Sequence, residues 1–198
     1  MHPRERRNGD LMIYLFLADG FETVEALCPL DLLRRAGADV KTVGVTGDTV
    51  TSRQGVTVKA DLNIDDISPE DLPEMLILPG GLPGADNLDA SDKVDEMILD
   101  GARRGAFLAA ICAAPYILGK RGLLEGRKAT CFPEKVFIDR LLGAEYTEDG
   151  AVRDGNIITA KAMGVSADFA LLLIEALFGR EKADEIAASV YHGESSAR

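Results

Sequence analysis

The residue of this chain best suited to chemistry is Cys112, in the segment AFLAAICAAP at residues 106–115. An apolar run long enough for a buried strand ends at this cysteine, and small residues then begin a helix. Such a turn exposes a thiol as a nucleophile elbow exposes a serine. Because the positive end of the helix favours the thiolate, we expect a depressed pKa. The alternative is that Cys112 is a small apolar residue in a buried strand.

A second candidate feature is the glycine-rich turn LPGGLPG at residues 78–84, which follows another apolar run. Its spacing does not match a dinucleotide fingerprint, and it contains no lysine for a phosphate-binding loop. The paired glycines, Gly80 and Gly81, let backbone N–H groups point into the crevice at the carboxyl ends of the strands, as an oxyanion site requires. A plain tight turn explains the same residues without chemistry.

Alternating apolar runs and helical patterns must position these two turns. We expect buried strands at 11–18, 40–45, 75–78 and 106–111, short polar strands near 50 and 56–58, and later strands at 128–131 and 156–160 with a hairpin turn at 151–155. We expect helices at 22–36, 91–104, 134–142 and 165–178. The pattern predicts an α/β fold, a doubly wound sandwich with a mostly parallel central sheet and helices on both faces.

The composition is that of an ordinary globular protein, with 198 residues, 46% hydrophobic and 28% charged. We expect one domain at 11–190, a flexible tail at 1–10 without a signal-peptide pattern, and a C-terminal tail at 191–198. The net charge of −11 argues against nucleic-acid and membrane-surface partners, and no apolar segment is long enough to span a membrane. Three widely separated cysteines indicate a reducing cytoplasm, and no residue spacing predicts a metal ion or cofactor.

Several motifs together resemble those of the ThiJ/PfpI superfamily and, within it, the DJ-one/ThiJ branch. They are LADGFETVE at 17–25, RRAG at 34–37, LPGG at 78–81, GADNL at 84–88 and AICAAP at 110–115. The resemblance runs from about residue 11 to residue 189. It implies a flavodoxin-like sandwich, usually a homodimer, and a site that needs no cofactor.

The implied site contains Cys112 as the nucleophile and Glu25, from the first helix, in contact with the sulfur. It also contains backbone N–H groups of Gly81 and Ala113. A carboxyl group buried beside a thiolate has a raised pKa, so we expect a protonated Glu25 that donates to the sulfur and keeps the cysteine ionised. The alternative for Glu25 is a solvated residue in the first turn of a helix, where the helix dipole favours a carboxylate.

This chain departs from the resemblance at its histidines. Protease-like members have a histidine directly after the cysteine, where this chain has Ala113, and others have one where this chain has Phe132. A cysteine–histidine dyad would have to recruit His192, close to the C-terminus, so a protease is not expected. The late loop AKAMG at 160–164 replaces a more usual Arg-Gly-Pro-Gly. We assign Gly80, Phe132 and Gly164 to the substrate pocket.

Three functions are compatible with these residues. The first is glyoxalase or deglycase chemistry on methylglyoxal, glyoxal or their adducts, with Cys112 as nucleophile and Glu25 as acid and base. The second is a redox sensor in which peroxide converts Cys112 to a sulfinate. The third is a chaperone that uses an apolar surface, and this function does not require Cys112. The sequence does not separate the first two, because both use the same residues.

Overall fold

The computed structural model describes residues 11–68, 71 and 73–193. Its centre is a seven-stranded sheet with the order β10-β11-β7-β6-β1-β2-β5. All neighbours in this sheet are parallel except β10 and β11. The parallel run β2-β1-β6-β7-β11 has the 2-1-3-4-5 order of flavodoxin-like folds, in which ligands bind at the carboxyl ends of the strands. The strands are β1 (Met12–Leu17), β2 (Asp39–Gly44), β5 (Leu62–Asn63), β6 (Met75–Leu78), β7 (Phe107–Ile111), β10 (Ala151–Asp154) and β11 (Ile157–Ala160).

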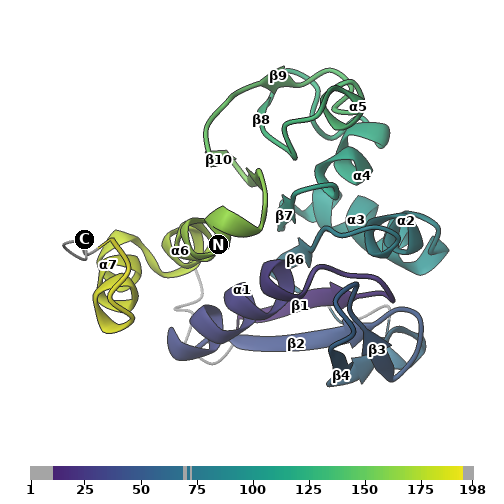
Figure 1. Ribbon diagram of the computed structural model, residues 1–198, viewed down its shortest axis with the longest axis horizontal. Helices are drawn as coiled ribbons and strands as arrows, with labels where there is room; N and C mark the ends of the chain where they lie inside the picture. Colours follow the sequence, from purple (N-terminus) through teal and green to yellow (C-terminus); the bar gives the residue numbers. More distant parts are fainter. Residues whose placement is uncertain (1–10, 69–70, 72, 194–198) are drawn as a thin grey trace, which may run out of the picture.

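Helices cover both faces of this sheet (Figure 1). One core layer joins the sheet to α1 (Thr23–Arg35), α6 (Ser166–Phe178) and α7 (Arg180–Ser189). The other joins it to α2 (Gly84–Asp89), α3 (Asp92–Arg104) and α4 (Pro115–Lys120). The remaining elements are β3 (Thr49–Thr51), β4 (Thr57–Lys59), β8 (Lys128–Ala129), β9 (Glu145–Tyr146), α5 (Lys135–Ile138) and the 3-10 turns η1 (Ile64–Asp66) and η2 (Met163–Val165).

The sequence pattern explains why the central elements form. Strand β1 is buried along almost its whole length, as a continuously apolar strand between two helical layers must be. Helix α3 begins at Ser91, whose side chain accepts a hydrogen bond from the Val94 N–H, and ends at Gly105 in the left-handed conformation. The caps and the apolar runs determine where each strand ends and the next helix begins. They therefore determine where the turns at the carboxyl edge of the sheet lie.

Most predicted elements are confirmed within one or two residues, and the exceptions are short or polar. The helix expected at 134–142 is limited to the four residues of α5, none of which is buried, so little packing extends it. The strand expected at 128–131 is only β8, and it pairs with β9 outside the central sheet. In Figure 1 these three elements form a separate lobe at the top. Helices α2 and α7 are not predicted by the sequence. The hairpin turn expected at 151–155 is wrong for residues 151–154, which form strand β10 and pair with β11, so the turn is limited to residues 155–156. The expected tail at 1–10 lies outside the described residues, as do residues 194–198 of the other tail.

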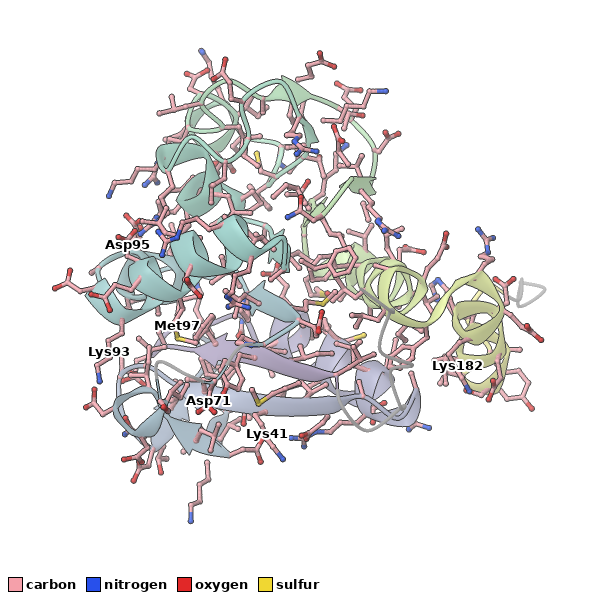
Figure 2. All side chains as sticks on the ribbon, turned by 180° about the vertical axis from the view of Figure 1, so that it is seen from behind. Lys41, Asp71, Lys93, Asp95, Met97 and Lys182 are labelled. Carbon is pink, nitrogen blue, oxygen red and sulfur yellow. The ribbon has the colours of Figure 1, made fainter. Side chains whose placement is uncertain are left out.

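Charged side chains cover the outer face of the second helical layer. Figure 2 shows Lys93 and Asp95 along α3. Asp95 pairs with Arg121, which directly follows α4 and has a side chain only 9% exposed. The same guanidinium bonds Asp89 at the end of α2 at 2.8 Å. These pairs join α4 to both neighbouring helices. Within the described residues, no helix is long and apolar enough to cross a membrane.

Candidate active site

Cys112 lies on the sharp turn that the sequence predicts. It follows β7 directly and has a φ of +65°, one of two positive values at described residues other than glycine. Its N–H donates to the Ala160 carbonyl at 2.9 Å, and its own carbonyl accepts from the Phe132 N–H at 2.8 Å. Non-glycine residues held at positive φ are uncommon and cluster at functional sites. The elbow is therefore confirmed, and hydrogen bonds on both sides hold it in place.

The glycine turn after β6 lies directly against this elbow. A Cβ on Gly80 would lie 2.6 Å from both Cys112 Cβ and Glu25 Oε2, so no side chain fits between these two residues. Gly81 has a φ of +87°, which favours glycine. Its N–H and that of Ala113 both donate to the sulfur of Cys112. The sequence-predicted N–H donors are thus brought together at the thiol.

Glu25 is the buried carboxyl group of the site, with 1% of its surface exposed. Its Oε2 accepts from the Gly80 N–H at 3.1 Å, and the carboxyl forms a hydrogen bond with the Cys112 side chain and accepts one from the Met163 backbone. Glu22, the N-cap of α1, accepts from the Glu25 N–H at 2.8 Å and fixes the start of the helix. The first turn of α1 therefore aims Glu25 at the sulfur, as the sequence-based assignment required.

The Glu25 carboxyl group and the Cys112 thiol are hydrogen-bonded to each other, and a negative charge on one disfavours a negative charge on the other. Burial raises the pKa of Glu25 to about 7, with a further rise from the Glu22 charge, while hydrogen bonds from Cys112, Gly80 and Met163 act to lower it. Burial and the Glu25 charge raise the pKa of Cys112, and the N–H groups of Gly81 and Ala113 oppose this rise.

The expected depressed pKa of Cys112 is therefore wrong in direction. The reason is that desolvation and a neighbouring carboxylate outweigh the N–H groups at the start of a helix of only six residues. The thiol donates to the Glu25 carboxylate, so the expected protonated Glu25 that donates to the sulfur is also reversed. A thiolate forms here when Glu25 takes the proton, so the pair titrates as a unit.

Of the three residues assigned to the substrate pocket, Gly80 and Phe132 contact the elbow, and Gly164 lies next to a residue that contacts Glu25. Gly80 separates Cys112 from Glu25, and Phe132 contacts the elbow through its backbone. Gly164 is exposed in the turn η2, and its neighbour Met163 is the residue that reaches Glu25. No sequence signal identifies Met163, because it acts through its backbone N–H.

The remaining histidine of the described residues does not pair with the thiol. His192 Nε2 lies 2.9 Å from Asp168 Oδ1 on α6, and its backbone N–H donates to the Ala187 carbonyl. The end of the chain is thus hydrogen-bonded as far as His192, where we expected a tail. The missed helix α7 explains this difference, since His192 follows it closely.

The pair geometry predicts how Cys112 reacts with an alkylating reagent. With iodoacetamide, we expect the rate at Cys112 to rise through an inflection near pH 7, where Glu25 titrates. Burial also raises the pKa of Cys28, and that of Cys131 to about 11. Within the described residues neither thiol is hydrogen-bonded to a carboxyl group that could take its proton, as Glu25 does for Cys112, so both should react more slowly at this pH. Peptide mass spectrometry after brief labelling measures the three rates separately. Dominant labelling of Cys28 or Cys131 at pH 7 would contradict the assignment of Cys112.

Comparisons with known proteins show which family this chain belongs to. The family model described as the DJ-1/PfpI family matches residues 12–176. Protein DJ-1 homolog A from Arabidopsis thaliana is 39% identical over 87% of this chain, which spans only 44% of that relative. The Parkinson disease protein 7 homolog from Danio rerio is 35% identical, with 88% of this chain and 93% of the relative covered. A solved DJ-1 from Toxoplasma gondii, in an oxidized form, has a TM-score of 0.88 and 33% identity over 93% of this chain and all of the other. The matched segment contains both Glu25 and Cys112, and this chain belongs to the DJ-1/PfpI family.

Proposed function

We propose that this protein converts small α-oxoaldehydes, such as methylglyoxal and glyoxal or their adducts, into hydroxy acids without a cofactor. One observation carries the proposal, namely the hydrogen bond between a carboxyl group with a pKa of about 7 and a thiol that receives two backbone N–H bonds. Such a carboxyl group is able to take and return protons at neutral pH. Lactate formation from methylglyoxal by the wild type and by Cys112→Ser tests the proposal.

The proposed reaction begins when Glu25 takes the proton of Cys112. The thiolate attacks the aldehyde carbon, a C–S bond forms, and the carbonyl electron pair moves to oxygen, near the N–H groups of Gly81 and Ala113. Glu25 gives its proton to that oxygen, which forms a hemithioacetal and restores the Glu25 carboxylate.

Glu25 completes the proposed sequence as a proton shuttle. Its carboxylate removes the proton from the former aldehyde carbon and returns it to the adjacent carbon, while the hydroxyl proton moves to the adjacent oxygen through an enediol. The product is the thioester of a hydroxy acid, because one carbon is oxidised as its neighbour is reduced. Water then hydrolyses the thioester, releasing the hydroxy acid and restoring the Cys112 thiol. Gly80, Phe132 and Gly164 remain our assignment for the substrate pocket in this scheme.

A second candidate function is that of a redox sensor. The N–H groups of Gly81 and Ala113 that face the sulfur of Cys112 would also hold the oxygens of a sulfinate. The relative from Toxoplasma gondii, solved in an oxidized form, supports this alternative. Peroxide that oxidises Cys112 in the absence of any aldehyde turnover would favour the sensor over the enzyme.

Peptide hydrolysis is not part of the proposed function. His192 pairs with Asp168 in the described structure, and Phe132 and Ala113 stand where other members have histidines. We therefore expect His192→Ala to leave aldehyde turnover within about twofold of wild type, since surface pairs contribute little to a distant site. Assays with unstructured peptides should detect no Cys112-dependent cleavage. Loss of turnover in a folded His192→Ala protein would show that a histidine takes part.

We further propose a homodimer in the reducing cytoplasm. Two observations support it. Val24 on α1 and Val56 near β4 are both large apolar residues that are about 40% exposed, and a hydrogen bond from Thr23 to Gln54 joins their two segments. All three cysteines are free, as a reducing compartment requires. The net charge of −11 continues to argue against nucleic acid and anionic membranes as partners.

A further inference from the structure

A buried tyrosine joins the two helices that follow the turns of the active site. Tyr116 lies in α4, four residues after Cys112, and only 1% of its surface is exposed. Its hydroxyl donates to Asp86 Oδ1 on α2 at 2.9 Å, and the Ala85 carbonyl oxygen lies 3.4 Å away. Helix α2 begins directly after the glycine turn, and α4 begins directly after the elbow. One side chain therefore bridges the two segments that supply N–H groups to the sulfur.

Each end of this bridge is bonded to a residue that contacts the sulfur. The backbone N–H of Tyr116 donates to the Ala113 carbonyl at 3.4 Å, and the N–H of Ala85 donates to the Gly81 carbonyl at 2.8 Å. Gly81 and Ala113 are the residues whose own N–H groups donate to Cys112. A short chain of hydrogen bonds, with the covalent link between Asp86 and Ala85, thus runs from Ala113 through Tyr116 to Gly81.

The tyrosine ring has little freedom to move. The guanidinium carbon of Arg140 lies 3.4 Å from the centre of the Tyr116 ring and stacks on it. Arg140 follows α5, in the same segment that begins at Phe132 against the elbow. Burial and the hydrogen bond to Asp86 raise the pKa of Tyr116, so its hydroxyl remains a donor throughout the pH range in which Glu25 titrates.

We propose that Tyr116 is a positioning residue, which holds the N–H groups of Gly81 and Ala113 at the sulfur of Cys112 through its hydrogen bond to Asp86. Loss of the hydroxyl would leave the ring, the stacking of Arg140 and the helix unchanged, but would let α2 move relative to α4. The N–H groups would then be less well aligned with a developing negative charge. The expected effect on turnover rests on the proposed function, but the expected effect on the alkylation of Cys112 does not.

The test compares Tyr116→Phe with Tyr14→Phe. Tyr14 is a matched control because it is also 1% exposed and lies in the same core layer, but on β1 away from the carboxyl edge. We expect Tyr116→Phe to slow the alkylation of Cys112 by iodoacetamide at pH 7–8 about tenfold, as misaligned donors stabilise the thiolate less well. The apparent pKa of the thiol should rise, and kcat for methylglyoxal should fall more than KM changes. Tyr14→Phe should keep the wild-type alkylation profile.

Variants of the acceptor separate positioning from a general loss of stability. Asp86→Ala should slow alkylation as Tyr116→Phe does, with no further loss in the double variant. Asp86→Asn retains an acceptor and should restore the wild-type profile. An unchanged pH profile of alkylation in folded Tyr116→Phe or Asp86→Ala would overturn the proposal, even if either variant had a lower melting temperature. If alkylation changes as expected while no variant, wild type included, turns over methylglyoxal, then the positioning role stands and the proposed enzyme function fails.

Discussion

Replacing Cys112 with serine is expected to abolish lactate formation from methylglyoxal, with a loss of at least ~10³-fold in kcat/KM. The hydroxyl of serine is a far weaker nucleophile than a thiolate, and Glu25, with a pKa of about 7, is too weak a base to ionise it. The backbone N–H groups of Gly81 and Ala113 remain in the variant, because they belong to the turns and not to the side chain. The measurement is lactate released over time from a purified protein free of thiol reagents.

Cys28→Ser is the matched control for this substitution. Cys28 is a free, half-buried cysteine on α1, one helical turn from Glu25, and no hydrogen bond joins it to the carboxyl group in the described structure. Its turnover should stay within a few-fold of wild type. Equal lactate formation by the wild type and Cys112→Ser would remove the thiol from the reaction. If neither protein formed lactate while peroxide converted Cys112 to a sulfinate, the redox sensor would be the better description.

The sequence predicts the central elements and the elbow because their signals are local. Strands β1, β6 and β7 are continuous apolar runs that end at a turn, and helix α3 has a serine at one end and a glycine at the other. The same pattern predicts the sharp turn at Cys112, because only residues 112–114 join the end of β7 to the start of α4. The positive φ of Cys112 is seen only in the structure. These features need no knowledge of which strands are neighbours.

The parts that the sequence does not predict depend on contacts between distant segments. Helix α7 has a weak apolar pattern, with only Ala183 and Ile186 buried, and packs mainly against α6. Residues 134–142 have a helical pattern, but Phe137 and Ile138 of α5 are only partly buried against the second core layer and Val136 is exposed, so little packing extends the helix. The Met163 N–H reaches Glu25 across more than a hundred residues of chain, and a backbone donor leaves no mark on residue type.

The direction in which the pKa of Cys112 shifts also depends on contacts that the sequence does not show. A helix start after a cysteine is visible in the sequence and favours the thiolate. The depth of burial and the contact with Glu25 are visible only in the folded chain, and both raise the pKa. The two effects that raise the pKa of Cys112 therefore depend on tertiary structure, and they outweigh the local effect of the helix start.

Replacing Glu25 with glutamine is expected to lower turnover by ~10²–10⁴-fold while the fold is retained. The amide keeps a hydrogen-bond donor toward the sulfur but neither takes nor returns a proton. The inflection near pH 7 in the alkylation of Cys112 should disappear, because it reports the titration of Glu25. Unchanged turnover would leave this carboxyl group with a structural role only.

Glu25→Gln should lower turnover but raise the free energy of unfolding above pH 7. Burial raises the pKa of Glu25 in the folded chain from 4.5 to about 7, so the folded state binds the proton more tightly than the unfolded state does. Wild-type stability should therefore fall as pH rises from about 4.5 to 7, by up to roughly 3 kcal/mol at 1.4 kcal/mol per pKa unit. Glu25→Gln removes this cost, and its free energy of unfolding, relative to wild type, should be higher at pH 8 than at pH 4.5.

Denaturant unfolding of both proteins at pH 4.5 and pH 8 measures this difference, and Glu22→Gln is its control. Glutamine at position 22 still has an oxygen that accepts from the Glu25 N–H, so the start of α1 is preserved. Removing the Glu22 charge should move the alkylation inflection to slightly lower pH, since that charge raises the pKa of Glu25. A Glu25→Gln protein that loses activity without gaining relative stability at pH 8 would contradict a buried carboxyl group that ionises at a cost. We expect Glu25→Gln to lose activity and to gain relative stability at pH 8. That result would mean that ionising the buried Glu25 destabilises the folded chain, and that the reaction needs this carboxyl group because it titrates near neutral pH.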